Sequence, residues 1–213
     1  MVQSQLNRLH GLVSDSITVY IYSMRSSSSS NGYAELVCAS NFTFLNGASH
    51  PQELVTRAAD LGYCAIALTD ECSLAGIVRA HEEAQRCKQR GQEIKLISGS
   101  LFRLENGSRL VLLAEDEVGY AQLCTLITRG RRNAPKGSYT LPDNAFENGL
   151  DHCLALWLPE INQRLPEENL LTAHWVASHF ATRSWLAVSL NLGFDDQSRL
   201  RNWRESLKLP VCQ

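Results

Sequence analysis

Short apolar runs alternate with helix-like segments along most of this chain, and this alternation constrains the fold more than any other feature. Ala34–Ala39 and Tyr63–Leu68 have the length of strands, and the second is apolar throughout, as in a strand buried on both faces. Between them, Glu53–Leu61 has a helical pattern that stops at Gly62. Repetition of this unit predicts an α/β fold with parallel strands, either a barrel or a doubly wound sheet. The hydrophobic period alone does not choose between those two.

The rest of the chain continues the alternation. We predict further strands at Ile94–Ile97, Phe102–Glu105, Arg109–Leu113, His152–Leu158, Trp185–Leu190 and Leu209–Gln213. We predict further helices at Ser73–Gln89, Asp116–Ile127, Pro142–Asn148, Glu167–Phe180 and Asp196–Leu207. Asn106 and Gly107 form a hairpin-turn signal between two of these strands. Ser49, with Gln52 three residues later, has the spacing of a capping box for the helix that begins near Pro51.

The composition indicates one globular domain: 213 residues, of which 44% are hydrophobic and 20% charged, suffice for a single large core. A net charge of −2 gives no electrostatic argument for nucleic-acid binding, which usually needs a basic surface. The 7 cysteines include no Cys-x-x-Cys pair, which argues against a disulfide framework or a zinc knuckle and favours a reducing, cytoplasmic compartment. No apolar run approaches the ~18 residues of a membrane helix, so we expect no membrane partner.

Residues 1–32 differ from the rest of the chain. They contain one short apolar run, Ile17–Tyr22, and a tract of serines from Ser26 to Ser30. A signal peptide would have a longer apolar centre after a basic start. We therefore expect residues 1–32 to be a disordered leader and residues 33–213 to form the folded domain.

Two segments carry a specific resemblance. Residues 33–51 read YAELVCASNFTFLNGASHP, and residues 67–76 read ALTDECSLAG. Together they resemble the N-terminal PHP (polymerase and histidinol phosphatase) domain of bacterial error-prone DNA polymerases of the C family. The resemblance continues, in the same order, through Lys95–Leu104, Leu110–Cys124 and Leu126–Arg132. It implies a distorted seven-stranded β/α barrel, which here would be incomplete because the chain ends before the last strands.

The resemblance also implies a function for a parent protein. That protein would be a DNA-directed DNA polymerase, a nucleotidyltransferase of the cytoplasm that serves DNA repair by damage-induced mutagenesis and translesion synthesis. Its partners would be DNA and other mutagenesis proteins. The palm carboxylates of such an enzyme would lie beyond Gln213, so we expect this chain alone to be inactive. The alternatives are a free-standing, metal-dependent PHP phosphoesterase and a non-enzymatic interaction module.

Three motifs depart from the metal-binding pattern of the PHP family. Members that bind metal show Leu-His-x-His-Ser where this chain has Leu-Val-Cys-Ala-Ser, so Val37 and Ala39 stand at the histidine positions. Thr-Asp-Glu replaces Thr-Asp-His, which keeps Asp70 and offers a carboxylate at Glu71. Leu101 stands where a glutamate is usual. We therefore assign no catalytic, cofactor-binding or metal-binding residue and expect no cofactor.

Simpler roles are available for the remaining polar candidates. Asp70 and Glu71 precede a predicted helix, and we expect them to cap its first N–H groups. His50, His81, His174 and His179 lack the spacing of a ligand set, and His174 and His179 are five residues apart in one helix. Cys38 and Cys72 are expected to be small core residues.

A basic stretch follows the third predicted helix, Asp116–Ile127. Arg129, Arg131, Arg132 and Lys136 could contact nucleic-acid phosphates, but cations are also favoured at a helix C-terminus by its dipole. Both interpretations stay open.

An incomplete barrel leaves one strand without a neighbour. We expect Ala34–Ala39 to be that edge, with part of the barrel interior open to water and a tendency to self-associate. Alternatively, the leader segment Ile17–Tyr22 covers the edge.

Overall fold

A computed structural model describes residues 32–104, 107–146, 150–159, 167–187, 198, 201 and 211–212. Its strands are β1 (Ala34–Cys38), β2 (Ala65–Leu68), β3 (Lys95–Arg103), β4 (Arg109–Ala114), β5 (Cys153–Leu158), β6 (Ser184–Ala187) and β7 (Val211–Cys212). Its α-helices are α2 (Pro51–Asp60), α3 (Ile77–Gln89), α4 (Glu117–Arg132) and α5 (Glu167–Phe180). Two 3₁₀ turns, η1 (Asp143–Phe146) and η2 (Ala181–Arg183), complete the described elements.

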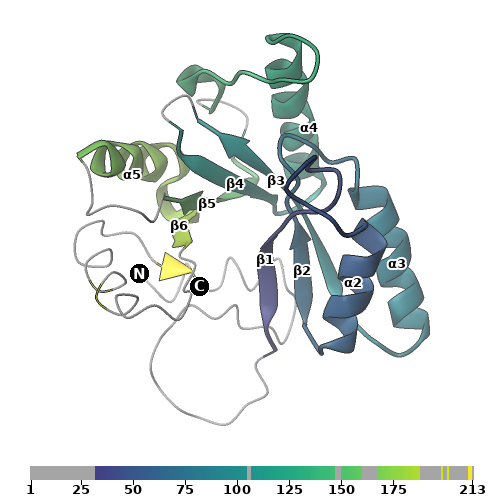
Figure 1. The fold of residues 1–213 in the computed structure, drawn as a ribbon. Coiled ribbons are helices and arrows are strands. Elements are labelled where there is room, and N and C mark those ends of the chain that lie inside the picture. The colour runs from purple at the N-terminus through teal and green to yellow at the C-terminus, as the bar shows by residue number, and fades with distance from the viewer. Residues whose placement is uncertain are drawn as a thin grey trace.

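The strands form a single sheet in which each strand lies beside the next one along the chain, from β1 to β7 (Figure 1). Strands β1, β2 and β3 are mutually parallel, β4 runs antiparallel to both β3 and β5, and β5, β6 and β7 are again parallel. In this order the sheet curls without pairing β1 to β7. The expected α/β fold, an incomplete β/α barrel, is confirmed.

The β3–β4 hairpin differs from prediction in one respect. Its antiparallel register, from Gly99 opposite Leu113 to Arg103 opposite Arg109, confirms the hairpin that the Asn-Gly signal indicated. The two strands predicted at 94–97 and 102–105 are, however, the continuous strand β3. Gly99 lies where the prediction left a break, and it is needed there for close packing: a Cβ atom would lie 2.6 Å from the Leu113 side chain and 2.9 Å from the Leu112 carbonyl oxygen.

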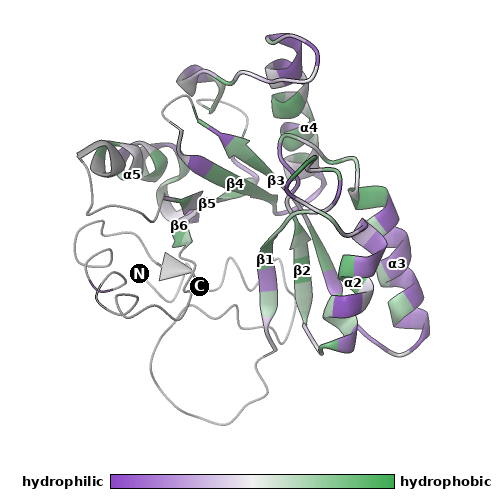
Figure 2. Cartoon of the chain, in the orientation of Figure 1, coloured by the Kyte–Doolittle hydropathy of each residue, from purple (hydrophilic) through white to green (hydrophobic). Residues whose placement is uncertain are grey.

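Both faces of the sheet carry buried apolar clusters, and the strands in Figure 2 are mostly green. Helices α2 and α3 pack on one face of β2, where Ile66 and Leu68 meet Val55 and Ala80. Helices α4 and α5 pack against β3, β4 and β5, in a cluster that includes Trp157. The other face is lined by Ala34, Leu36, Ala65, Ala67, Ile97, Val111, Leu113, Leu154, Leu156 and Trp185. Successive residues of a strand point to opposite faces, and both faces are buried, so the strand sequences are continuously apolar.

The observed starts of the helices agree only in part with the capping signals in the sequence. Asp116 caps α4 as predicted, accepting the Gly119 N–H at 2.9 Å, although the helix extends to Arg132. For α2 the capping position is His50 and not Ser49, and the His50 N–H donates to Glu53 at 2.7 Å. Helix α3 begins at Ile77, four residues after the predicted Ser73. Of the short helix predicted at 142–148, the structure describes a 3₁₀ turn at Asp143–Phe146.

Strand β1 is the first strand of the sheet, and among the described residues it pairs with β2 alone. Its register shifts between Glu35 and Cys38, and the Val37 N–H donates to the Glu35 carboxylate at 3.0 Å. Whether β1 is a free edge or is covered by residues 17–22 stays a prediction, because that segment lies outside the described residues. The side chains of Ala34 and Leu36 on this strand are buried.

Several predictions fall outside the described residues. These are the leader at 1–32 apart from its last residue, the segment 17–22 within it, the last part of the strand at 185–190, and most of the helix at 196–207. The residues that the structure describes include no helix long and apolar enough to cross a membrane.

Candidate functional site

The carboxyl ends of β1, β2 and β3 meet at one edge of the sheet, which is where β/α barrels place their functional residues. The segment after β1 brings Ser40 and Thr43 to this edge, the segment after β2 brings Asp70 and Glu71, and β3 contributes Ser100. These residues form a hydrogen-bonded cluster.

Asp70 is the centre of the cluster and is buried, with 1% of its surface exposed. Its Oδ1 accepts the Ser40 N–H at 2.8 Å and the Thr43 hydroxyl at 2.6 Å, and its Oδ2 accepts the Ser40 hydroxyl at 2.7 Å. All three donors come from the loop after β1. The expectation that Asp70 caps the following helix was wrong, because α3 begins seven residues later, at Ile77, and has no side-chain cap.

Ser100 and Leu101 connect β3 to the segment that follows β2. The Ser100 hydroxyl donates to the Asp70 carbonyl at 2.8 Å and accepts the Ser73 N–H at 3.1 Å. The Leu101 N–H also donates to the Asp70 carbonyl, at 3.2 Å. The Leu101 side chain packs with the apolar residues of the inner cluster around Ala34. This position therefore contributes packing and backbone bonds, and no side-chain ligand.

The Glu71 backbone N–H donates to the Thr43 hydroxyl within the Asp70 cluster, but the Glu71 side chain belongs to a second, more exposed group. Its carboxylate accepts Arg103 Nε at 2.9 Å and the Tyr139 hydroxyl at 2.9 Å, while the Tyr139 oxygen accepts the Arg103 N–H at 2.8 Å. Burial raises the pKa of Tyr139. The Glu71 carboxylate is thus an ion-pair partner and not the helix cap that the sequence suggested.

The basic stretch divides into two parts. Arg131 lies over the Tyr139 ring, 5.5 Å from its centroid, and donates to the Cys72 carbonyl at 3.2 Å. It therefore has a role within the protein. Arg129, Arg132 and Lys136 are exposed near the end of α4. For these three, contact with nucleic acid stays a prediction.

The remaining candidates have ordinary surroundings. Cys72 is buried as expected, whereas Cys38 is only half-buried; burial raises the pKa of each thiol to about 11. His50 lies 2.9 Å from the Asn41 amide at the start of α2. His81 and His174 are exposed, and His179 stacks on Trp175 at 4.5 Å. Across the part of the chain that the structure describes, no three His, Cys, Asp or Glu side chains gather in a metal-binding arrangement.

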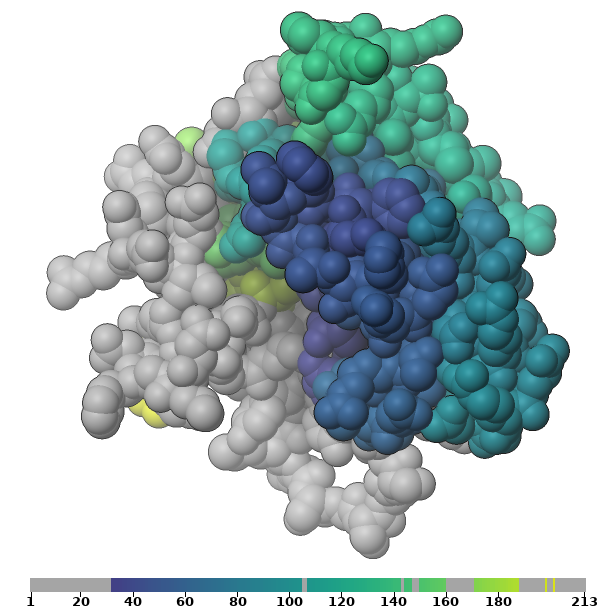
Figure 3. All heavy atoms as spheres, turned by 45° about the vertical axis from the view of Figure 1, so that its right-hand side comes forward, coloured from purple at the N-terminus to yellow at the C-terminus, as the bar shows by residue number. Residues whose placement is uncertain are grey.

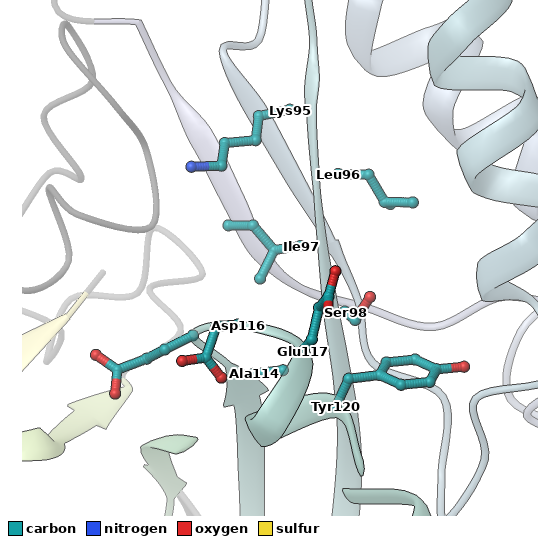
Figure 4. A pocket seen from close by; sticks show the side chains of 9 residues that line it. Lys95, Leu96, Ile97, Ser98, Ala114, Asp116, Glu117 and Tyr120 are labelled. Carbon is teal, nitrogen blue, oxygen red and sulfur yellow. The ribbon is translucent and has the colours of Figure 1, made fainter. Parts of the chain in front are cut away.

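A half-open hollow of about 340 Å³ lies at the opposite edge of the sheet, between the start of β3 and the start of α4 (Figure 4). Lys95, Ile97, Asp116 and Tyr120 are among the residues that line it. Burial lowers the pKa of Lys95. Nearby, His152 Nδ1 lies 2.7 Å from Asp116 Oδ2. This hollow lies at the amino end of the parallel strand β3, away from the Asp70 cluster.

The comparisons with known proteins agree with this architecture. The model of the PHP domain matches residues 35–189. The chain belongs to the PHP domain family. It is 53% identical over 171 residues to an error-prone DNA polymerase of Pseudomonas paraeruginosa, and 54% identical over 169 residues to one of Methylococcus capsulatus. These matches cover 80% and 79% of this chain but only 16% and 15% of the relatives. The resemblance to the PHP portion of such polymerases is confirmed.

Solved structures support the fold alone. A protein of Bifidobacterium adolescentis described as a metal-dependent phosphoesterase matches with a TM-score of 0.56 and 12% identity, over 84% of this chain and 85% of that one. An amidohydrolase of Chromobacterium violaceum with bound sulfate matches with a TM-score of 0.53 and 14% identity, over 81% of this chain and 83% of that one.

The residues of this PHP domain do not fit a multinuclear metal centre. Val37, Ala39 and Leu101 carry no lone pair for a cation. The carboxylate of Asp70 accepts three hydrogen bonds, one from a backbone N–H and two from hydroxyl groups. These donors take three of the carboxylate's roughly four lone-pair sites, so a cation there would compete with the contacts that hold the loop after β1.

Sequence reasoning missed the hydrogen-bond partners of Asp70 and Glu71: Ser40, Thr43 and Ser100 for Asp70, and Arg103 and Tyr139 for Glu71. One signal was available for the first two. Hydroxyl residues directly after a buried strand, in a segment without charge, are suited to satisfy a buried carboxylate at the end of the neighbouring strand.

Proposed function

We propose that this chain is the PHP portion of an error-prone DNA polymerase and that it serves as a structural scaffold, without chemistry of its own. The parent enzyme would be a DNA-directed DNA polymerase of the cytoplasm that acts in damage-induced mutagenesis and translesion synthesis, with DNA and other mutagenesis proteins as partners. The observation that supports a scaffold best is the Asp70 cluster. The Asp70 carboxylate, in the segment that resembles the Thr-Asp-His motif of metal-binding members, holds the segments after β1 and β2 together.

Measurement of bound metal tests the proposal that this domain has no catalytic activity. The purified chain should contain no stoichiometric zinc or manganese by elemental analysis, before or after incubation with either ion. The double variant Val37→His with Ala39→His should gain little, because Leu101 still supplies no ligand and Asp70 remains hydrogen-bonded. Stoichiometric metal in the unaltered chain would overturn the scaffold proposal and favour a free-standing phosphoesterase.

Activity assays separate the alternatives. We expect no hydrolysis of a chromogenic phosphate ester and no primer extension, and a metal-binding PHP phosphoesterase and a complete polymerase serve as positive controls. Hydrolysis that survives repurification would support the phosphoesterase. The DNA sequence downstream of the codon for Gln213 tests the polymerase origin, because reading frames that encode a polymerase palm are expected there.

A further inference from the structure

We infer that the loop of residues 40–49, here called the docking loop, inserts its apolar tip into the polymerase part of the parent protein. The inference rests on the proposed function and deepens it, because it names the surface through which the PHP domain would be held. Four observations carry it: how the loop is anchored, what its tip exposes, what charge it lacks, and how much of the relatives lies outside this chain.

The base of the docking loop is fixed at several points. The Asp70 carboxylate accepts hydrogen bonds from Ser40 and Thr43. The Asn41 N–H donates to the Ser49 carbonyl at 2.9 Å and closes the loop. The Gly47 N–H donates to the Thr43 carbonyl at 2.9 Å, and a Cβ atom on Gly47 would lie 1.9 Å from the Ser40 carbonyl oxygen. The loop therefore has one well-determined conformation.

The tip of this anchored loop is apolar and faces solvent. Phe44 is 83% exposed and Leu45 is 89% exposed. Leu45 also has a φ of 67°, which is a left-handed conformation. This conformation is energetically unfavourable for any residue other than glycine. Beside the tip, the Phe42 ring lies 5.6 Å from the Arg79 guanidinium. Figure 3 shows the indigo atoms of this part of the chain at the front surface.

A rigid apolar tip is suited to binding. Single exposed apolar residues are ordinary, but here two large ones are adjacent, and the backbone that presents them is strained and held by buried hydrogen bonds. A preformed loop loses little conformational entropy when it binds, so more of the free energy of apolar burial remains as affinity. The strain and the exposure are both explained if the tip fills a pocket.

The chemistry of the loop identifies the occupant. Residues 39–49 read ASNFTFLNGAS and contain no charged side chain, so the complementary surface is an uncharged apolar pocket of a protein. Nucleic acid is disfavoured, because binding to it depends on cations that meet phosphates. The polymerase relatives extend far beyond the matched part, since this chain covers only 16% of the Pseudomonas paraeruginosa protein. The pocket would lie in that remainder.

A chimera provides the test. The full-length Pseudomonas paraeruginosa polymerase is made with its matched part replaced by the corresponding residues of this chain, and hydroxyl-radical footprinting compares it with the 213-residue chain. We expect Phe44 and Leu45 to be modified readily in the chain and to be protected in the chimera. Equal modification in a chimera that extends primers would overturn the docking inference and leave the scaffold proposal standing. A chimera without polymerase activity would contradict the scaffold proposal and the inference with it.

Substitution separates docking from folding. Phe44→Ser with Leu45→Ser should leave the thermal unfolding of the 213-residue chain unchanged, because both side chains are exposed. In the chimera the same pair should shorten the half-life of primer extension at elevated temperature by at least about tenfold, as expected for loss of a buried anchor. Leu171→Ser, at a residue that is 70% exposed on α5, is the matched control. An unchanged half-life, or protection of the tip by self-association of the chain, would overturn the inference.

Discussion

The hydroxyl of Ser40 donates to Oδ2 of Asp70 at 2.7 Å, and the backbone N–H of the same serine donates to Oδ1 at 2.8 Å. One residue thus engages both oxygens of a buried carboxylate across the ends of two neighbouring strands. Hydrogen bonds to a charged acceptor are stronger than neutral ones, and leaving such an acceptor unsatisfied is costly. Asp70 thus acts as a structural clamp between the ends of β1 and β2.

Ser40→Ala should lower the free energy of unfolding by about 1–3 kcal/mol, because it leaves one oxygen of a buried carboxylate without its hydroxyl donor. Urea unfolding followed by circular dichroism would measure the change. Ser138→Ala is the control, since that hydroxyl is exposed and donates only to the Pro135 carbonyl. Equal stability of the two variants would contradict the clamp.

Tyr139→Phe should lower the free energy of unfolding by about 1–2 kcal/mol. The substitution removes the donor to Glu71 and the acceptor for the Arg103 N–H while it keeps the ring beneath Arg131. Tyr63→Phe is the matched control, because the structure shows the Tyr63 ring packed against Tyr33 and no hydrogen bond of its hydroxyl to a described residue. If both variants unfold at the same urea concentration as the unaltered chain, the Glu71 group contributes no stability.

The ion pair between His152 and Asp116 should make stability depend on pH. The hydrogen bond between His152 and Asp116 raises the pKa of His152 above its usual 6.5. The pKa of Asp116 is lowered below 3.8, mainly by the hydrogen bond from the Gly119 N–H and next by the one from His152. The histidine contribution is complete below pH 6.5 and is lost as the pH rises through the higher, folded-state pKa. The aspartate contribution is present above pH 3.8 and is lost as the pH falls through the lower, folded-state pKa.

His152→Gln should therefore lower the unfolding temperature more at about pH 5.5 than at about pH 9. The effect should shrink in high salt, because both side chains are nearly half exposed. Asp151 and Glu115 also face this histidine and act in the same direction. His81→Gln, at an exposed histidine of α3, should show no such difference. A pH-independent loss in His152→Gln would show that the residue acts through packing alone.

Two glycines of α4 should respond differently to alanine. A Cβ atom on Gly119 would lie 2.1 Å from the His152 carbonyl oxygen, a backbone atom that cannot move aside. Gly119→Ala should cost about 1–3 kcal/mol in the free energy of unfolding. On Gly130 the Cβ would lie 3.0 Å from the tip of the Leu141 side chain, and the better helix propensity of alanine offsets about 1 kcal/mol of crowding. Similar unfolding midpoints for the two variants would contradict this difference.

Most of the fold could be predicted from the sequence, because the strands are apolar and are separated by helical patterns. The run Ala65–Leu68 is buried at every position, and the Asn-Gly signal correctly indicated the β3–β4 hairpin. Errors arose where a local signal competed with tertiary contacts. Gly99 resembled a break, yet it lies within β3, where a Cβ atom would lie 2.6 Å from the Leu113 side chain of β4. The capping position moved from Ser49 to His50 because Pro51 takes the first position of α2.

The candidate site was only half predictable. The lack of donors at Val37, Ala39 and Leu101 is visible in the residues themselves. The partners of Asp70 are not, because Ser40 and Thr43 lie 30 and 27 residues away along the chain. Only the pairing of β1 with β2 brings them together. A helix cap is the local alternative for such a carboxylate, and the sequence offered nothing that favoured the distant hydroxyls over it.

The consecutive order of the strands has a consequence for how this protein is made. Each strand lies beside the one that precedes it along the chain, so none has to be inserted between two that have already paired. A chain emerging from the ribosome, amino end first, can add one strand at a time to a growing sheet. Contacts between sequence neighbours also keep loop closure short, which favours rapid folding. Among the described strands β1 emerges first, and only β2 has to follow before Asp70 can bind the loop after β1.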